Sequence, residues 1–393
     1  MRHYGTFLRA HPLVARLAAV QTLTYFGAWF SNVAIYTMAL SWGVGAFWIG
    51  MIAVVQLLPG IMQAPFSGPL VDRLPARALM MGLLGVEIAA TGMLLIVNSR
   101  EDLWLLLGLL FVRMSAASFY FTAEMSLLPK ILSGEALRQA NEIHSIIWSF
   151  CYTAGMAASG LAVHWWGATM AIAIDCSLFI LAWFVLAKAP LPRQKGNATE
   201  PMGAMIVEGW RYLWAHPKLL GLMALHATVG LTAYDALVAL LADFYYRDVI
   251  AVALAIGWIN AIRALALMVG PMFLGRLMTP RRLVWLLVIQ GVAIVIWGWW
   301  QHDFWLSLIG TFVAGFWTST IWSYTYTMLQ ERTEPAFLGR VIAYNDMLFT
   351  TTAALTSITI GLLIDYGWQP ESITWAIGGG FLVSGMLYGL WKK

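Results

Sequence analysis

The chain carries charged and titratable side chains in the middle of long apolar stretches. Arg113 and Glu124 lie in one such stretch, and His226, Asp235 and Arg263 lie in two others. At the centre of a lipid bilayer an ionised side chain costs about 2.5–3.5 kcal/mol, so each group needs a partner, a water-filled cavity or a function. A carboxylate that is alternately buried and wetted can bind and release a proton. Glu124 and Asp235 are therefore candidate proton carriers, with His226 as a third; fixed ion pairs and helix packing are the alternative roles.

Polar side chains also recur at helical spacing within the apolar stretches. Tyr25 and Asn32 are seven residues apart, as are Arg113 and Tyr120, and Glu124 follows one turn later. Residues at such intervals share one face of a helix. The eleven residues from Arg113 to Glu124 span about 16 Å, too far for an ion pair within one helix. Each of the two is expected to find its partner on another helix or in water.

Composition determines the environment of these residues. Hydrophobic residues make up 61% of the chain and charged residues 11%, against about 45–50% and 25% in soluble domains. A soluble fold lacks the interior to bury so much apolar surface, so the chain is predicted to be an all-α, polytopic membrane protein. The two cysteines, Cys151 and Cys176, lie in apolar runs and are expected to be small core residues. No nucleic-acid partner is expected from the net charge of +4.

Twelve membrane spans are predicted from hydropathy and periodicity. They cover residues 13–41, 44–71, 77–98, 103–128, 141–163, 167–188, 218–243, 250–276, 282–300, 303–329, 341–365 and 371–391. The one long connection divides the chain into a six-span bundle (1–189), a linker (190–217) and a second six-span bundle (218–393). Within the linker, residues 205–214 carry Ile206, Trp210, Leu213 and Trp214 on one side, which predicts an amphipathic helix lying on the membrane surface.

The basic residues predict the orientation. Nineteen of the 23 Lys and Arg residues fall on the termini and the loops of one side, and two fall on the opposite loops. Because cytoplasmic loops carry an excess of Lys and Arg, both termini and the linker are predicted to be cytoplasmic.

A short charged stretch joins the second and third spans, with the sequence Gly68-Pro69-Leu70-Val71-Asp72-Arg73-Leu74-Pro75-Ala76-Arg77. It resembles the loop between helices 2 and 3 of the major facilitator superfamily of transporters, with Pro75 in place of the usual glycine. Related features recur in the second half: Gly270-Pro271 with Arg276 matches Gly68-Pro69 with Arg73, and Arg138, Gly160 and Gly167 match Arg340, Gly361 and Gly367. The resemblance implies the superfamily fold, two pseudo-symmetric bundles of six helices with the substrate between them.

Further motifs resemble one subgroup of that superfamily. The stretch Tyr326-Thr327-Met328-Leu329-Gln330-Glu331-Arg332-Thr333-Glu334-Pro335-Ala336-Phe337-Leu338-Gly339-Arg340-Val341 is similar to the loop between helices 10 and 11 of bacterial enterobactin exporters and macrolide efflux proteins. Three shorter pieces are similar to the same subgroup: Leu128-Pro129 with Ala140-Asn141, Glu208-Gly209-Trp210-Arg211-Tyr212 with His216-Pro217, and Ile174-Asp175. The subgroup implies export of a small amphipathic molecule across a bacterial cytoplasmic (inner) membrane.

The resemblance also implies which residues contact the substrate and which form a cytoplasmic gate. In the superfamily, spans 1, 4, 7 and 10 line a central cavity, and the implied substrate contacts are Tyr25, Asn32, Arg113, Tyr120, Thr318 and Trp322, with Arg263 from span 8. The implied cytoplasmic gate consists of Gly68, Asp72, Arg73, Arg77, Arg340 and Asp346. Glu87 and Asp175 fall on peripheral spans and are expected to be structural, bonded to neighbouring helices.

The leading hypothesis is a secondary active transporter that exports a siderophore, a macrolide or another drug by alternating access, with protons as the coupling ion. The alternative on the same fold is import of a ferric siderophore or another anionic solute, for which Arg113 and Arg263 are suited, or movement of a lipid between leaflets. An enzyme is not indicated, because the sequence has no metal-ligand cluster, phosphate-binding glycine loop or nucleophile elbow. No cofactor or metal is expected, and the chain is predicted to act as a monomer in the bilayer.

Overall fold

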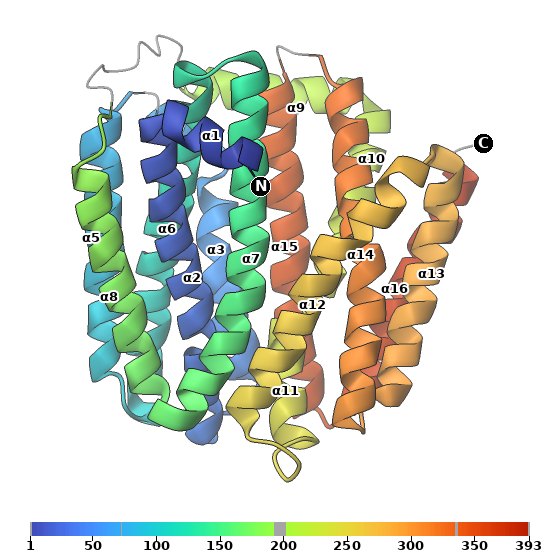
Figure 1. Cartoon of the computed structure of the whole chain (residues 1–393). Coiled ribbons are helices and arrows are strands. Elements are labelled where there is room, and N and C mark those ends of the chain that lie inside the picture. Colours follow the sequence, from blue (N-terminus) through green and yellow to red (C-terminus); the bar gives the residue numbers. More distant parts are fainter. Residues whose placement is uncertain (1, 72, 192–201, 335–336, 392–393) are drawn as a thin grey trace.

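The computed structural model describes residues 2–71, 73–191, 202–334 and 337–391 (Figure 1). These ranges fold into helices and connecting turns without a strand, as the sequence predicts. We call the elements up to α8 the amino half: α1 (Arg2–Ala10), α2 (Pro12–Ser41), α3 (Ala46–Gln63), α4 (Ser67–Val71), α5 (Ala76–Met93), η1 (Leu94–Ile96), η2 (Arg100–Asp102), α6 (Leu103–Ile131), α7 (Gly134–Trp166) and α8 (Ala168–Ala187). The surface helix α9 (Met202–Ala215) leads to the carboxyl half: α10 (Pro217–Ala227), η3 (Thr228–Thr232), α11 (Asp235–Phe244), α12 (Val252–Leu274), η4 (Gly275–Leu277), α13 (Pro280–Trp300), α14 (Phe304–Arg332), α15 (Leu338–Asp365) and α16 (Pro370–Trp391).

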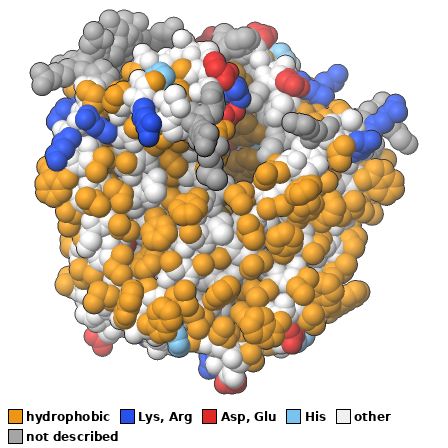
Figure 2. Space-filling view, viewed as in Figure 1, with side chains coloured by type: hydrophobic (Ala, Val, Ile, Leu, Met, Phe, Trp, Pro, Cys, Tyr) orange, Lys and Arg blue, Asp and Glu red, His pale blue; other side chains and the backbone are white. Residues whose placement is uncertain are grey.

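The number of membrane spans is roughly consistent with the predicted twelve. Among the described residues, eleven helical segments are long and apolar enough to cross a membrane. The first predicted span corresponds to α2, which has 30 residues and buries the polar side chains Gln21, Thr24 and Asn32 inside the bundle. Figure 2 shows apolar side chains over the flank of the molecule and Lys and Arg mostly near one end. The chain is therefore a multi-pass membrane protein.

The two halves lie side by side and approach each other through two pairs of helices. In each pair one helix comes from each half: α3 packs against α15, and α7 packs against α12. Figure 1 shows α7 and α12 meeting at the lower end and diverging toward the upper end. We call the lower end, with the last residue of α15, the Asp365 end, and the upper end, with α1 and α9, the α9 end.

The hydrophobic core follows the same arrangement. One cluster of buried side chains belongs to the amino half near the α9 end and includes Val14, Leu17, Met80, Leu127 and Leu186. A second cluster extends from the amino half into the carboxyl half and includes Ile35, Ile49, Met156, Ile256 and Ile360. The halves thus share a continuous core toward the Asp365 end. Near the α9 end the surface between them is hollowed (Figure 2).

Glycines allow the two helix pairs to cross closely at the Asp365 end. A Cβ atom on Gly361 of α15 would lie 2.5 Å from the Ala46 carbonyl oxygen of α3, and one on Gly160 of α7 would lie 2.9 Å from the Ala253 carbonyl oxygen of α12. Real Cβ atoms do not approach oxygen so closely, and small residues are the usual means by which membrane helices bring their backbones together. The pseudo-symmetry proposed from Gly160 and Gly361 is therefore visible as two equivalent crossings.

The seventh predicted span is not one continuous helix. It breaks into α10 and α11, with the 3₁₀ turn η3 between them. The hydroxyls of Thr228 and Thr232 donate to the carbonyls three residues earlier, at 2.6 and 2.7 Å, and such bonds compete with regular helix. Gly230 brings the turn against α15, where a Cβ atom would lie 2.7 Å from the Phe349 carbonyl oxygen. Hydropathy alone could not reveal this break, because the segment stays apolar throughout.

The second predicted span is also interrupted. The helix α3 ends at Gln63, and α4 begins at Ser67. Pro65 lies between them, and proline lacks the N–H group that would continue the helix.

Candidate functional site

The Arg113 side chain pairs with a carboxylate of another helix inside the amino half. One of its guanidinium nitrogens lies 2.7 Å from Asp175 Oδ2 of α8, and the other donates to Ser31 Oγ of α2 at 2.9 Å. The guanidinium carbon lies 5.2 Å from the centre of the Phe179 ring. With side-chain exposures of 4% for Arg113 and 0% for Asp175, the pair is sealed from solvent. The expectation that Arg113 finds its partner on another helix is confirmed.

The surroundings of this ion pair are closely packed and contain a second carboxylate. Gly27 of α2 lies so near Asp175 that a Cβ atom there would overlap the carboxylate. Glu87 of α5 is 5% exposed and lies close enough to interact with both charges of the pair. Asp175 is thus bonded to a neighbouring helix, as expected. Arg113 faces α8 in this structure, and its contact with a substrate remains a prediction.

A second polar cluster in the amino half surrounds Glu124. This carboxylate is 3% exposed, and its charge acts on the phenol groups of Tyr25 and Tyr120. His144 of α7 completes the cluster: it hydrogen-bonds with Gln21, and its ring meets the Tyr25 ring edge-on at 6.0 Å. Three of the predicted site residues are therefore brought together, on α2 and α6.

Two other predicted substrate contacts are engaged within their own halves. Asn32 donates from Nδ2 to Gln56 Oε1 of α3 at 3.2 Å, and its own Oδ1 is buried without a partner among the described residues. Thr318 of α14 accepts a hydrogen bond from Gln290 Nε2 of α13 at 2.9 Å. The predicted roles of Asn32 and Thr318 in substrate binding stay predictions.

The break in span 7 places a charged pair next to the amino half. Arg263 of α12 lies 3.2 Å from Asp235 Oδ1 and donates to the Thr232 carbonyl oxygen at 2.6 Å. Its guanidinium carbon lies 5.1 Å from the centre of the Tyr234 ring. The Asp235 side chain is 34% exposed and that of Arg263 is 11% exposed, so this pair is more open to water than Arg113 and Asp175. Asp235 thus has the ion-pair role that was the alternative to proton transfer, and its partner is Arg263, for which binding of an anionic solute was considered.

Aromatic residues of the amino half approach this second pair. The phenol groups of Tyr36 on α2 and Tyr152 on α7 are near enough to interact with the Asp235 charge. Trp29 stacks on Tyr152 with ring centres 4.2 Å apart. Tyr152 was not a candidate from the sequence. The signal that could have found it is its position one helical turn after Trp148, which orients both rings to one face.

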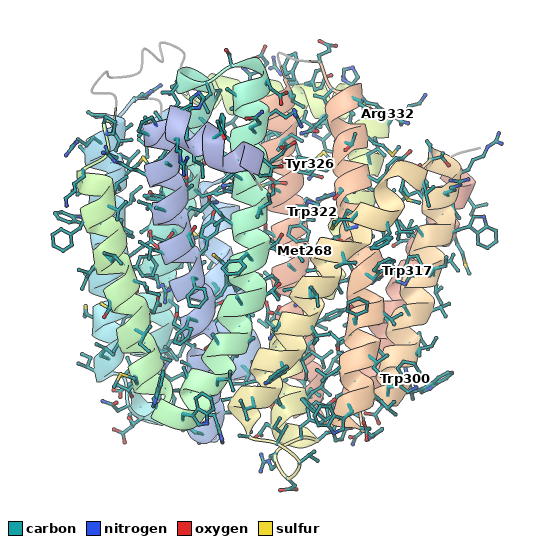
Figure 3. The ribbon with its side chains drawn as sticks, viewed as in Figure 1. Met268, Trp300, Trp317, Trp322, Tyr326 and Arg332 are labelled. Atoms are coloured by element: carbon teal, nitrogen blue, oxygen red, sulfur yellow. The ribbon has the colours of Figure 1, made fainter. Side chains whose placement is uncertain are left out.

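His226 lies within an aromatic cluster of the carboxyl half. Its Nδ1 is 2.8 Å from Thr325 Oγ1, and its ring centre is 4.4 Å from that of Trp322 and 5.6 Å from that of Tyr326. Figure 3 shows Trp322 and Tyr326 on the side of α14 that faces the amino half, and Trp317 on the opposite side. His226 is fully buried, which fits the helix-packing role that was the alternative to proton transfer.

The arrangement can bind charged groups and pack against apolar rings. Among the described residues, no three His, Cys, Asp or Glu side chains are grouped to hold a metal ion. The profile of the Major Facilitator Superfamily matches residues 17–254, more than half of the chain.

The chain belongs to the Major Facilitator Superfamily.

Relatives and solved structures agree with this membership. The chain is 24% identical over 332 residues to macrolide efflux protein A of Streptococcus pyogenes, which covers 80% of this chain and 79% of that protein. It is 22% identical over 331 residues to macrolide efflux protein A of Enterococcus faecalis, which covers 81% of this chain and 99% of that protein. The crystal structure of the nucleoside transporter NupG superposes with a TM-score of 0.76 at 14% identity, over 97% of this chain and 99% of that chain. The predicted superfamily fold and the resemblance to macrolide efflux proteins are confirmed.

The gate that the superfamily motif predicts lies at the α9 end. Gly68 belongs to α4, Asp72 lies outside the described residues, and Arg73 is exposed. Arg77 donates to the carbonyl oxygens of Ala187 at 2.6 Å and Ala189 at 3.2 Å. Ala187 is the last residue of α8 and Ala189 follows two residues later, and a helix end leaves such acceptors unpaired. Arg77 is therefore engaged within the amino half.

In the carboxyl half, the surface helix α9 contacts the predicted gate residue Arg340 and the residues just before it. Arg340 at the start of α15 pairs with Glu208 of α9 at 2.5 Å. Tyr212 of α9 stacks on Phe337 with ring centres 4.1 Å apart and accepts a hydrogen bond from the Glu334 N–H at 3.2 Å. Two motifs that are separate in the sequence, the surface helix and the loop before span 11, are thus one docked unit of this superfamily member.

Asp346, the last predicted gate residue, lies two turns into α15. Its Oδ1 accepts a hydrogen bond from Asn345 Nδ2 at 3.3 Å, and its charge acts on the Tyr326 phenol. Asp346 is therefore directed toward the aromatic cluster around His226. In this conformation the half-buried Asp346 lies near Tyr326, and its role as a gate stays a prediction.

Proposed function

We propose that this superfamily member exports a small amphipathic molecule by alternating access and is driven by protons. The observation that carries the proposal is the asymmetry of the contact between the halves. They share a core and two glycine crossings at the Asp365 end, while Arg77 and Arg340 at the α9 end are each held by groups of their own side. A bundle pair closed at one end and parted at the other is one of the two states that alternating access requires.

The side to which the hollow opens follows from a proposed orientation. The excess of Lys and Arg on one side supports placing both termini, the linker 190–217 and the α9 end in the cytoplasm of a bacterial cell. The bundles 1–189 and 218–393 would then rock against each other in the cytoplasmic membrane, and the monomer suffices for this movement. In that orientation the present conformation is open to the cytoplasm, the state in which an exporter takes up its solute, and the names of the macrolide efflux relatives support this direction.

The site electrostatics support an amphipathic substrate over an anionic one. Arg113 and Arg263, the two arginines inside the spans, already have Asp175 and Asp235 as partners. Neither offers an unneutralised charge to a ferric siderophore or another anion, whereas Trp322 and the rings near it offer an apolar, aromatic surface. The names of the macrolide efflux relatives point to the same class of solute. A macrolide or a similarly large, uncharged or cationic drug is the substrate class we propose.

Glu124 is the proton carrier that the geometry favours. Asp235 is held in an ion pair by Arg263, and His226 is packed among rings and bonded to Thr325. Glu124 instead lies next to the phenols of Tyr25 and Tyr120, in the buried polar cluster that His144 completes. A carboxylate in such a place binds a proton when it is enclosed and releases it when the site opens to water.

Everted membrane vesicles test this proposal. The vesicles are prepared from cells that lack other macrolide exporters and that express the protein. They should accumulate a radiolabelled macrolide when respiration acidifies the vesicle interior. An uncoupler should abolish this accumulation. Glu124→Gln should lower the gradient-driven rate at least about tenfold, since losing a proton carrier removes the coupled step. Asp248→Asn, which neutralises an exposed carboxylate in the loop after α11, should leave the rate unchanged. Accumulation that persists with the uncoupler, or in Glu124→Gln, would contradict the proton mechanism.

A further inference from the structure

The crossing of α3 and α15 contains a bond between the halves that the sequence motifs did not indicate. The Asp365 carboxylate, at the end of α15, accepts hydrogen bonds from the Ala46 N–H and the Phe47 N–H of α3, each at 2.9 Å. These are two of the first-turn N–H groups that every helix leaves without an internal partner. The carboxylate also lies at the positive end of the α3 dipole. One side chain of the carboxyl half therefore caps a helix of the amino half.

Local sequence makes room for this cap. Gly45 precedes α3, and a Cβ atom there would lie 3.3 and 3.4 Å from the two Asp365 carboxylate oxygens. One turn before Asp365, Gly361 lets α15 approach the Ala46 carbonyl. The chain reverses direction at Gly367, whose φ of 87° is in the left-handed region that glycine adopts without strain. These glycines bring the carboxylate to the helix end and keep it there.

The related crossing of α7 and α12 provides a comparison within the same molecule. Gly160 and Gly257 lie against each other there, just as Gly361 and Gly50 each lie against the backbone of the partner helix at the first crossing. The residue four positions after Gly361 is Asp365, and the residue four positions after Gly160 is His164. His164 is exposed and has no carboxylate to offer to the start of α12. Both crossings have the close backbone contact, but the acidic cap is a feature of the α3–α15 crossing.

We propose that Asp365 is a latch that holds the Asp365 end shut and must release α3 before the halves can part there. The latch stabilises the conformation that is open at the α9 end, because both of its hydrogen bonds join groups of opposite halves. When the Asp365 end opens, α3 and α15 separate and the carboxylate returns to water. This inference rests on the alternating access proposed above, and it assigns a role to a residue outside the substrate site and the superfamily loop motif.

The expected effect is moderate, because Asp365 is exposed to solvent. Removing an acidic helix cap typically changes an equilibrium by about fivefold. Asp365→Asn keeps the shape of the side chain, removes its charge, and turns a donor NH2 group toward one of the two N–H groups, so one of the two hydrogen bonds is lost as well. We expect the ratio of the state open at the Asp365 end to the closed state to rise about fivefold in this variant.

Distance measurements across the Asp365 end test the latch directly. Spin labels would be placed at Arg100 of η2 and Trp368 after α15, two exposed positions on opposite halves, in the full chain with Cys151→Ala and Cys176→Ala, reconstituted in lipid nanodiscs. In Asp365→Asn the population of long inter-label distances should increase relative to the wild type. His164→Ala is the matched control at the equivalent place of the other crossing, and it should leave the distances unchanged.

A rescue variant separates the cap from general damage. Adding His164→Asp to Asp365→Asn supplies a carboxylate to the start of α12, and the distances should shift back toward those of the wild type. An unchanged distribution in Asp365→Asn, an equal shift in His164→Ala, or no recovery in the double variant would each overturn the latch. Because the distances are measured without substrate or gradient, they do not depend on the transport assay. Wild-type protein that fails to transport a macrolide would count against the proposed function and leave the latch result standing.

Discussion

Arg113 and Asp175 form a buried ion pair, and each charge offsets the free-energy cost of burying the other in the bilayer. Removing one partner of such a pair leaves an uncompensated charge and typically costs about 3–5 kcal/mol, whereas replacing both by apolar residues is often close to neutral. We therefore expect Arg113→Leu to lower the stability of the purified protein strongly, and Arg113→Leu with Asp175→Leu to recover most of the loss. Thermal unfolding followed by tryptophan fluorescence measures both variants.

The control for this prediction is Arg100→Leu, which removes an exposed arginine from the Asp365 end and should change stability little. Equal unfolding temperatures for the single and double variants would show that Asp175 does not need Arg113. The double variant also separates an effect on transport from an effect on folding. Because it should fold without the ion pair, its transport rate shows whether transport requires these two charges.

The sequence indicated that buried charges need partners but not which partners they have. For Asp235 it left an ion pair as the alternative to proton transfer, and the structure pairs Asp235 with Arg263 of the adjacent span. For Arg113 the sequence required a partner on another helix but did not indicate which one. Asp175 lies on a helix assigned to the periphery, and only the rotation of α8 about its axis, set by packing against α2, turns it toward Arg113.

The surface helix α9 is expected to move together with α15. Glu208 and Arg340 are 57% and 22% exposed, so their attraction is worth at most about 1 kcal/mol. Glu208→Arg places two positive charges together and should lower the initial transport rate in vesicles by about threefold to fivefold, since like charges repel by a similar amount. Glu208→Arg with Arg340→Glu restores the attraction in reverse and should recover the rate.

Glu101→Arg is a suitable control, because it makes the same change of charge on an exposed residue at the opposite end. Should the double reversal at positions 208 and 340 remain as slow as the single one, the coupling of α9 to α15 would have to come from the Tyr212–Phe337 stack alone.

Hydropathy predicts where a membrane span lies but not where its helix breaks. Span 7 was predicted as one helix because its apolar residues are continuous, yet Gly230 and two threonine hydroxyls break it into α10 and α11. The break matters for the site, since it puts Asp235 at the start of α11 and exposes the Thr232 carbonyl to Arg263. Local hydrogen bonds of this kind depend on the contact with α15, which no single-helix pattern contains.

For the whole molecule, the number of spans, the duplicated halves and the superfamily followed from hydropathy and motifs. The state of the transporter did not, because two packings of the same helices differ by only a few kcal/mol and the sequence encodes both. Asp365 illustrates the limit. Its position at the end of span 11 was predicted, but its bond to α3 exists only in the conformation that is closed at that end.

Substitutions at the glycine crossings test whether transport requires the close contact of the two halves at the Asp365 end. A Cβ atom on Gly361 would lie 2.5 Å from the Ala46 carbonyl, so Gly361→Ala must push α3 and α15 apart. Such overpacking costs about 1–3 kcal/mol, while the helix itself gains about 0.5–1 kcal/mol from alanine. The fold should therefore survive, the closed Asp365 end should lose population, and vesicle transport should fall about tenfold. Gly160→Ala, with 2.9 Å to the Ala253 carbonyl, should have a smaller effect. A Cβ atom on Gly379 of α16 would meet no neighbouring atom within 4 Å, so Gly379→Ala should transport like the wild type; equal losses in all three variants would mean that close contact at the Asp365 end is not what transport requires.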